Sequence, residues 1–414
     1  MSTLTPKEKL TAAQKFKLLN KTIDSLNKKA GANVINFLSD PDTREKLTIR
    51  YIPFPSLRLN AMCSGLPIGR VSIIAGMPDS GKTSLILETI GLAMKEDPDF
   101  IAFWLESEKS LEIKAIVEMF GIDPERFIYV DLTKGLPAEK TLDIMEAAIE
   151  SGGIDIAVIN SLKCLTPSKE FEDSMEDQNI GLQARLNGKL MRKIVPLIAE
   201  QETALCMTQH LSTQIGVMHG DPMTMSGGFS IKFASMLTLD LRKKSIQKDD
   251  PITKEEGQKI GVYVMKNHCN QTRYPYLRGD YYIKFGEGTQ IFTEIIELSI
   301  ENGTLTKGGG GWISETDIAT GEPKVLKDGS LAKWHGMAKI KEYLEANPDY
   351  YEYLKSIVMG EEIKLETLDE EDLAIAESIS NISEEEIAKM ESVLDNASSS
   401  TTKKKSNKKK TTTA

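Results

Sequence analysis

A lysine and a threonine at the end of a glycine-rich segment are the residues of this sequence best suited to phosphate chemistry. Lys82 and Thr83 complete the pattern Gly-x-x-x-x-Gly-Lys-Thr, which begins at Gly76. The full segment is Gly76, Met77, Pro78, Asp79, Ser80, Gly81, Lys82, Thr83 and Ser84. In such a loop the backbone N–H groups point at phosphate oxygens, the lysine reaches the β- and γ-phosphates, and the threonine hydroxyl holds Mg²⁺. The pattern predicts a site for ATP and Mg²⁺.

Polar side chains at the ends of three further apolar runs are candidates for the chemistry itself. They are Glu106, Glu108, Asn160 and Gln209. A carboxylate such as Glu108 can orient an attacking water, and an amide such as Gln209 can sense the γ-phosphate. An exposed loop acid and a satisfied buried amide are the competing interpretations of these two residues.

Asn160 occupies the Walker B position, where an aspartate is usual. Asparagine keeps an oxygen and the shape of aspartate, but it lacks the charge that holds the water shell of Mg²⁺. We therefore expect Asn160 to meet the ion through water, with Glu106 or Glu108 as possible sources of compensating charge. If Mg²⁺ binding limits turnover, Asn160→Asp should raise it.

Alternating apolar runs and helix-like stretches must position these side chains. Strands are expected at residues 71–75, 100–105, 127–130, 154–159 and 204–207, and helices at residues 85–94, 110–120, 138–151 and 181–201. This alternation predicts an α/β fold with a mostly parallel sheet covered by helices. Ligands of such sheets bind at the carboxyl ends of the strands, where the polar residues above should converge.

Further elements are expected on both sides of this core. Strands at residues 236–241, 261–266 and 281–285 are expected to be antiparallel at the sheet edge, and residues 334–359 to form two helices separated at Asn347-Pro348. An amphipathic helix should begin at Thr5-Pro6 and stop near Gly31, packed on its own core or on another subunit. The predicted domains are residues 1–50, 51–297, 298–360 and 361–414.

Composition limits the class of protein. The formal net charge of -10 argues against a generally basic nucleic-acid binder, but a local basic groove stays possible. The four cysteines lie far apart, which favours neither a zinc cluster nor a disulfide framework. No apolar run has the length of a membrane span and the amino terminus lacks a signal core, so we expect a cytoplasmic protein with no membrane partner.

Three segments have the composition of nucleic-acid contacts or of solvated surface. Arg185, Lys189 and Arg192 recur at helical spacing, and residues 210–228 form a long loop with apolar tips that could wedge between bases. Residues 361–414 are acidic and then lysine-rich, which is typical of a disordered tail. The alternative for the tail is electrostatic regulation of DNA binding.

Over residues 50–350 the chain resembles the bacterial and phage RecA recombinases. The resemblance is carried by Gly65-Leu-Pro67-Ile-Gly69-Arg70, the phosphate loop, Glu106-Ser-Glu108, Leu165-Thr-Pro167, Gly181-Leu-Gln-Ala-Arg185, Ile215-Gly216-Val217-Met218, Ser226-Gly227-Gly228, Val264-Met-Lys266-Asn267 and Phe285-Gly286-Glu287-Gly288. It implies a RecA-like P-loop NTPase core with an amino-terminal helix and a small carboxy-terminal α/β domain. It also implies an ATP-dependent recombinase that forms helical filaments on single-stranded DNA and exchanges strands with homologous duplex DNA.

The resemblance also implies roles for individual residues. The catalytic set would be Glu108, Lys82, Gln209 as γ-phosphate sensor, and Lys266 reaching ATP from the neighbouring subunit. Glu112 and His268 join the phosphate loop and Asn160 as nucleotide-binding residues. The DNA-binding set would be Ile180, Arg185, Lys189, Arg192, Ile215, Gly216, Ser226, Gly227 and Gly228. The partners implied are DNA, further copies of the chain, and single-strand-binding and loader proteins in a bacterial cell or phage-infected bacterium.

Several departures from the family pattern leave other functions open. His268 replaces a second lysine, Asn160 replaces the Walker B aspartate, and Ala115 or Ile116 stands where a tyrosine stacks on adenine. One alternative is therefore a filament-forming DNA-binding protein with weak or no ATPase. The other is a hexameric RecA-fold helicase, which the amino-terminal helix and the two loops disfavour.

Overall fold

The computed structural model describes residues 11–109, 111–132, 135–162, 165–172, 181–213, 223–225, 229–247, 250–269, 276–317, 321–360, 366–367, 370 and 373. The chain divides into two units, Met1–Arg50 and Tyr51–Ala414.

The first unit contains two helices, α1 (Ala12–Ala30) and α2 (Pro41–Leu47). Helix α1 begins later than predicted, because Thr11 is extended and forms a capping box with Gln14; Thr5 and Pro6 lie outside the described residues. The helix ends at Gly31 as predicted, where a φ of 71° suits glycine. No residue of α1 is buried.

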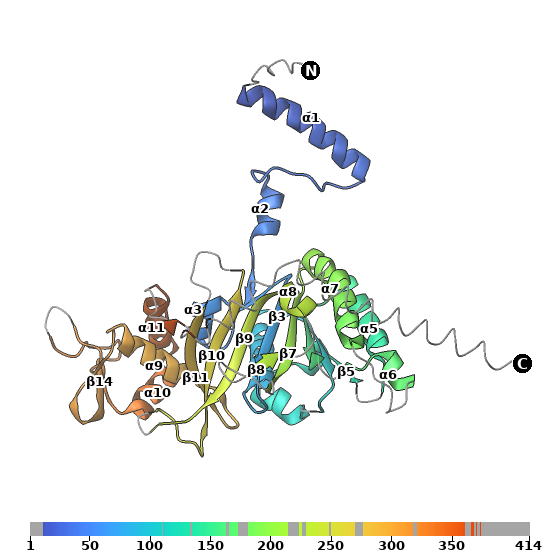
Figure 1. Cartoon of the computed structure of the whole chain (residues 1–414). Helices are drawn as coiled ribbons and strands as arrows, with labels where there is room; N and C mark the ends of the chain where they lie inside the picture. Colours follow the sequence, from blue (N-terminus) through green and yellow to red (C-terminus); the bar gives the residue numbers. More distant parts are fainter. Residues whose placement is uncertain are drawn as a thin grey trace, which may run out of the picture. The chain divides into compact units, whose positions relative to one another are not determined.

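The second unit is built on one large sheet (Figure 1). Its strands are β3 (Val71–Gly76), β4 (Ala102–Glu106), β5 (Phe127–Asp131), β6 (Ile156–Asn160), β7 (Ala204–Thr213), β9 (Ser235–Lys244), β10 (Gly257–Asn267), β11 (Leu277–Lys284) and β12 (Gly288–Thr289). They follow the order β12-β11-β10-β9-β3-β7-β6-β4-β5. The six strands from β9 to β5 in this order are parallel, which confirms the predicted α/β fold.

The edge strands differ from the prediction in one respect. Strands β10 and β11 are antiparallel, as expected, but β9 runs parallel to β3. Ser235 at the start of β9 pairs with Val71 at the start of β3, so the chain has already returned to the amino end of the sheet. The connection from β7 is long enough for such a crossover and contains α8 (Phe229–Ala234).

Helices cover both faces of the sheet. Helices α3 (Leu57–Cys63) and α4 (Lys82–Glu96) pack on one face, and α5 (Ala138–Glu150) and α7 (Leu182–Glu200) on the other, each over its own hydrophobic core. The helix expected at residues 110–120 includes a short π-helical turn, η1 (Ala115–Met119). The remaining short elements of this part are β1 (Tyr51–Ile52), β2 (Leu66–Pro67), η2 (Pro124–Arg126), α6 (Ser168–Glu172) and β8 (Met223–Met225).

A third hydrophobic cluster lies beyond β12. Its buried side chains come mainly from α9 (Ile291–Glu301), β14 (Trp312–Ser314), β15 (Lys333–His335), α10 (Met337–Ala346) and α11 (Pro348–Gly360). The other elements of this part are β13 (Thr306–Lys307), η5 (Gly309–Gly311) and β16 (Glu366–Thr367), which pairs with β11. The two helices predicted around Asn347-Pro348 are confirmed. Among the described residues, no helix combines the length and apolar character needed to cross a membrane.

Candidate functional site

The phosphate loop joins β3 to α4 and has little room for larger residues. A Cβ at Gly76 would lie 2.4 Å from Ser80 Oγ and 2.5 Å from the Leu241 carbonyl oxygen. Gly81 begins α4 with a φ of 84°, and no side chain caps this helix end. Met77, Pro78 and Asp79 are exposed, whereas Gly81, Thr83 and Ser84 are half-buried. The first N–H groups of α4 are therefore placed as a phosphate cradle requires.

Lys82 lies inside this cradle. Its Nζ donates hydrogen bonds to the carbonyl oxygens of Met77 at 2.8 Å and Gly76 at 3.2 Å. Burial lowers the pKa of Lys82, and the nearby carboxylates of Glu108, Asp79 and Asp240 oppose that shift. A buried lysine surrounded by backbone oxygens is suited to an anionic ligand.

The strand register brings the polar residues predicted from sequence to one edge of the sheet. Ala75 of β3 pairs with Gln209 of β7, and Glu106 of β4 pairs with Asn160 of β6. The expected convergence is therefore confirmed for Glu106, Asn160 and Gln209. In the described part of the chain, the buried atoms Ser80 Oγ and Gln209 Oε1 have no hydrogen-bond partner. A phosphate group or a metal-bound water could satisfy both, so these residues fit a nucleotide with Mg²⁺.

Asn160 belongs to a buried hydrogen-bond network with Glu106, which is fully buried. The Asn160 Nδ2 donates to Glu106 Oε2 at 2.9 Å, and the Thr208 hydroxyl donates to Asn160 Oδ1 at 2.7 Å. Trp104 Nε1 and the Glu108 backbone N–H also donate to Glu106, each at 2.8 Å. The negative charge next to Asn160 therefore lies on β4, and the asparagine contributes a donor that an aspartate would lack.

Glu108 has a partner that sequence reasoning missed. His210 Nε2 lies 2.7 Å from Glu108 Oε1. Burial alone would raise the pKa of Glu108, but hydrogen bonds from Ser161 and His210 and the charges of His210 and Lys82 hold it below its usual value. Glu108 is thus kept as a carboxylate beside the phosphate loop. The position of His210 directly after Gln209 was the one available sequence signal.

The residues expected to act on a neighbouring subunit's ATP lie apart from this edge. Lys266 is buried, and its Nζ donates to the carbonyl oxygens of Lys232 and Phe233 in α8 at 2.9 and 3.2 Å. Burial lowers the pKa of Lys266 to about 8. His268 lies just beyond β10, and partial burial of its ring together with the charge of Lys266 lowers its pKa. Glu112 is exposed shortly before η1.

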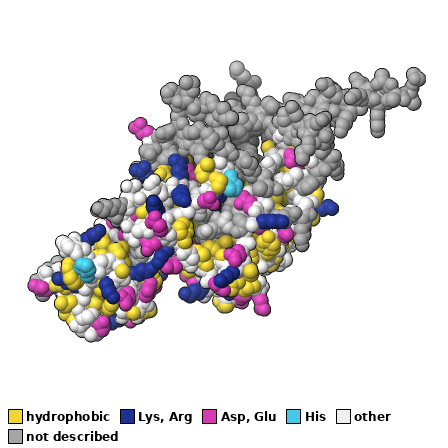
Figure 2. All heavy atoms as spheres, turned by 90° about the horizontal axis from the view of Figure 1, so that it is seen from below, with side chains coloured by type: hydrophobic (Ala, Val, Ile, Leu, Met, Phe, Trp, Pro, Cys, Tyr) yellow, Lys and Arg dark blue, Asp and Glu magenta, His cyan; other side chains and the backbone are white. Residues whose placement is uncertain are grey.

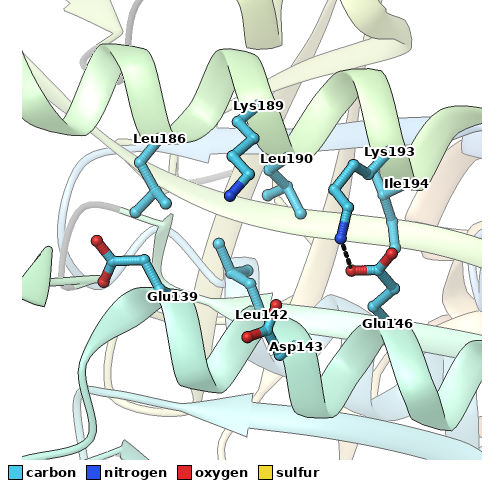
Figure 3. A pocket seen from close by; sticks show the side chains of 9 residues that line it. All are labelled: Glu139, Leu142, Asp143, Glu146, Leu186, Lys189, Leu190, Lys193 and Ile194. Atoms are coloured by element: carbon cyan, nitrogen blue, oxygen red, sulfur yellow. Dashed lines mark hydrogen bonds and ion pairs between the residues drawn. The ribbon is translucent and has the colours of Figure 1, made fainter.

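The three basic residues predicted on one face of α7 have different surroundings. Arg185 is half-buried near the helix start, and its Nε is buried without a hydrogen-bond partner among the described residues. Lys189 points toward α5, where it lines a pocket with Glu139 and Asp143 (Figure 3). Arg192 is exposed, and its guanidinium lies near Gly188 and Ser230 of α8.

The two predicted DNA loops are mostly outside the described residues, which exclude Ile180, Ile215, Gly216, Ser226, Gly227 and Gly228. The base of the second loop is described: β7 pairs antiparallel with β8, from Leu211 and Met225 to Thr213 and Met223. On the face drawn in Figure 2, acidic and basic side chains of the coloured residues are interspersed and not gathered by sign.

Comparison with known proteins gives consistent similarities. The family model of the RecA N-terminal domain matches residues 17–290. "Protein RecA" of Chlorobium chlorochromatii is 34% identical over 303 residues, which cover 72% of this chain and 82% of the relative. The proteins of the same name from Aquifex aeolicus and Bacteroides thetaiotaomicron are 30% and 31% identical, and the matches cover 81% and 84% of this chain and 90% and 98% of the relatives.

Proposed function

Because the chain belongs to the RecA family of DNA recombination and repair proteins, we propose that it is an ATP-dependent recombinase. It binds single-stranded DNA, assembles into helical filaments, and catalyses pairing and strand exchange with homologous duplex DNA. The observation that carries this proposal is the register that brings Gln209 beside the phosphate loop, with Glu108 paired to the adjacent His210.

The residues around the phosphate loop have separate roles in this proposal. The loop and Lys82 bind the phosphates, Thr83 binds Mg²⁺, and Asn160 contacts the ion through water. Bound Mg²⁺ neutralises charge that develops on the phosphates. Glu108 orients the attacking water and accepts its proton, while Gln209 senses the γ-phosphate. Lys266 and His268 reach the site of the neighbouring subunit, and Glu112 contributes to nucleotide binding.

The DNA contacts and the partners follow from the same assignment. We assign the sugar-phosphate and base contacts to Arg185, Lys189, Arg192 and the two loops that contain Ile180, Ile215, Gly216, Ser226, Gly227 and Gly228. The partners are DNA, further copies of this chain, and single-strand-binding and loader proteins. We place the protein in the cytoplasm of a bacterial cell or phage-infected bacterium.

The experiment that tests the proposal measures ATP hydrolysis by the full chain with and without single-stranded DNA, with electron microscopy of the same samples. We expect turnover that DNA stimulates, on regular filaments. Glu108→Gln should abolish most of that turnover, because a positioned base contributes about 10²–10⁴-fold. The matched control is Glu118→Gln, which removes an exposed carboxylate and should change nothing. Turnover that does not respond to DNA, or equal turnover in Glu108→Gln, would contradict the proposal.

A second function is favoured by one observation. Both polar atoms of the Asn160 side chain are engaged by Glu106 and Thr208. If these hydrogen bonds persist when ATP binds, Asn160 does not contact the water shell of Mg²⁺. The chain is then a filament-forming DNA-binding protein with weak or no ATPase. Filaments that require ATP but do not hydrolyse it would identify this function. Closed rings in place of filaments would instead identify a helicase.

A further inference from the structure

The contact between Glu108 and His210 links two parts of the molecule with different proposed tasks. Glu108 follows β4 beside the phosphate loop, and His210 lies on β7. Their side chains are 24% and 26% exposed, so the pair lies at the surface edge of the site and not within the core. A pair in this position can separate without disturbing the packing of either strand.

His210 stands where β7 leaves the parallel sheet. It is the last residue of β7 that pairs with β3, opposite Gly76 of the phosphate loop. From the next residue, Leu211, the strand pairs with β8 in a hairpin. A movement of this hairpin therefore acts on His210 first, and on the neighbouring Gln209.

The pair also limits what Glu108 can do. Glu108 Oε1 is engaged by His210 at 2.7 Å, and Ser161 donates a further hydrogen bond to the carboxylate. A carboxylate that orients an attacking water needs a lone pair directed at that water. An oxygen that already accepts a hydrogen bond has fewer lone pairs left for this purpose. The hydrogen bonds from Ser161 and His210 and the charge of Lys82 also weaken Glu108 as a base, because they lower its pKa.

We propose that His210 is a positioning residue that restrains Glu108 until the β7–β8 hairpin moves. The restraint rests on the proposed function, since it regulates the proposed ATPase. When single-stranded DNA displaces the hairpin, His210 releases Glu108 Oε1, and Glu108 turns to the attacking water. DNA then stimulates ATP hydrolysis by breaking the contact between His210 and Glu108. Neither the phosphate loop nor Gln209 makes this contact.

The test compares ATP hydrolysis by the full chain and two variants, His210→Leu and His210→Gln, with and without single-stranded DNA. In His210→Leu we expect the DNA-free kcat to rise on the order of tenfold, part of the roughly 10²–10⁴-fold that a positioned base contributes. The KM for ATP should stay unchanged, and the stimulation by DNA should fall by the same factor. His210→Gln retains a donor of similar reach and should behave like the natural chain. His210→Ala repeats the deletion without the bulk of leucine.

The control is His335→Leu, which removes an exposed histidine of β15 and should leave the stimulation unchanged. An unchanged or lowered DNA-free kcat in both His210→Leu and His210→Ala overturns the restraint. If the natural chain hydrolyses ATP normally, only the restraint fails in that case. If neither the natural chain nor the variants hydrolyse ATP, the proposed ATPase fails together with it. Turnover that appears only in the variants supports the restraint and identifies His210 as the reason for the inactive natural chain.

Discussion

Asn160 and Glu106 together carry one buried negative charge. The carboxylate of Glu106 accepts hydrogen bonds from Trp104, Asn160 and the Glu108 backbone, and all of these side chains except Glu108 are buried. A second carboxylate at position 160 would face the first without a donor between them. At the scale of single residues, the asparagine is therefore matched to its neighbour, although the Walker B position taken alone suggests a lost charge.

This pairing changes the expected effect of restoring the aspartate. Asn160→Asp should lower the free energy of unfolding by about 1–3 kcal/mol, because it removes a donor to a buried carboxylate. It should also fail to raise ATP turnover. The double variant Glu106→Gln with Asn160→Asp should recover part of the stability, since one charge and one amide remain; Trp104 Nε1 loses its acceptor, so recovery is incomplete.

Urea unfolding of the two single variants and the double variant measures this coupling. Additive losses of stability would show that the two side chains do not depend on each other. A gain in turnover by Asn160→Asp alone would restore the simpler interpretation, in which Mg²⁺ binding is limited by the missing charge.

At the scale of elements, the structure separates the basic residues of α7. Lys189 and Lys193 face α5, where Lys193 pairs with Glu146 and Lys189 lies opposite Glu139 and Asp143 (Figure 3). Arg185 lies one turn from Gly181, at the helix start that follows the first predicted DNA loop. Helical spacing therefore places these residues on one face, and the neighbouring helix decides which of them can meet DNA.

We expect Arg185→Gln to weaken single-stranded DNA binding more than Lys189→Gln. Each phosphate contact that is lost should reduce the slope of log affinity against log salt concentration by about one. The slope should therefore fall by about one in Arg185→Gln and by less in Lys189→Gln, because Glu139 and Asp143 already offset part of the charge of Lys189. Fluorescence anisotropy over a range of salt concentrations measures both slopes. Equal losses in the two variants would mean that the whole face of α7 contacts DNA.

Helix α9, in the carboxy-terminal part, carries acidic side chains that lie against the start of α3. Glu294 is buried and accepts hydrogen bonds from Ser56 Oγ and the Leu57 N–H at the start of α3, at 2.6 and 2.8 Å. One turn later, burial raises the pKa of Glu297 from its usual 4.5 to about 7, with Glu301 and Glu294 adding to the shift and Arg58 and Lys259 opposing it.

Glu297 should make stability depend on pH. Between about pH 4.5 and 7 the folded chain keeps a proton that the unfolded chain has released, so stability falls as pH rises through this window. The loss amounts to at most about 3 kcal/mol at 1.36 kcal/mol per unit of pKa. Glu297→Gln should remove this dependence, whereas the exposed Glu118→Gln should keep it. Urea unfolding at pH 5 and pH 7 measures the effect, and an identical pH dependence in Glu297→Gln would contradict it.

At the scale of the whole molecule, the two units differ in what they bury. The second unit contains all three hydrophobic clusters, whereas α1 of the first unit has no buried residue and exposes Phe16, Leu19 and Leu26. An amphipathic helix whose apolar face is about half exposed needs another surface to cover it. Among the predicted alternatives for α1, this favours a role in assembly.

A chain limited to residues 51–414 should fold and keep its thermal unfolding midpoint, but it should not form filaments. In the full chain, Leu19→Ser should weaken assembly, because it removes an apolar side chain that is half exposed in the single chain. Ser25→Ala on the same helix is the control. Light scattering and electron microscopy with ATP and single-stranded DNA measure assembly, and filaments of normal length from residues 51–414 would exclude this role of α1.

Short-range sequence patterns determined the phosphate loop, the buried strands and the convergence of polar residues at their carboxyl ends, because these depend on spacing and on the rule that parallel strands share one edge. Tertiary structure decided the rest. The direction of β9 depends on the connection after β7, which brings the chain back to the amino end of the sheet. The partners of Glu108 and Asn160 lie 102 and 54 residues away in the chain. No local pattern encodes which side chains meet across adjacent strands, because that choice follows from strand order and register.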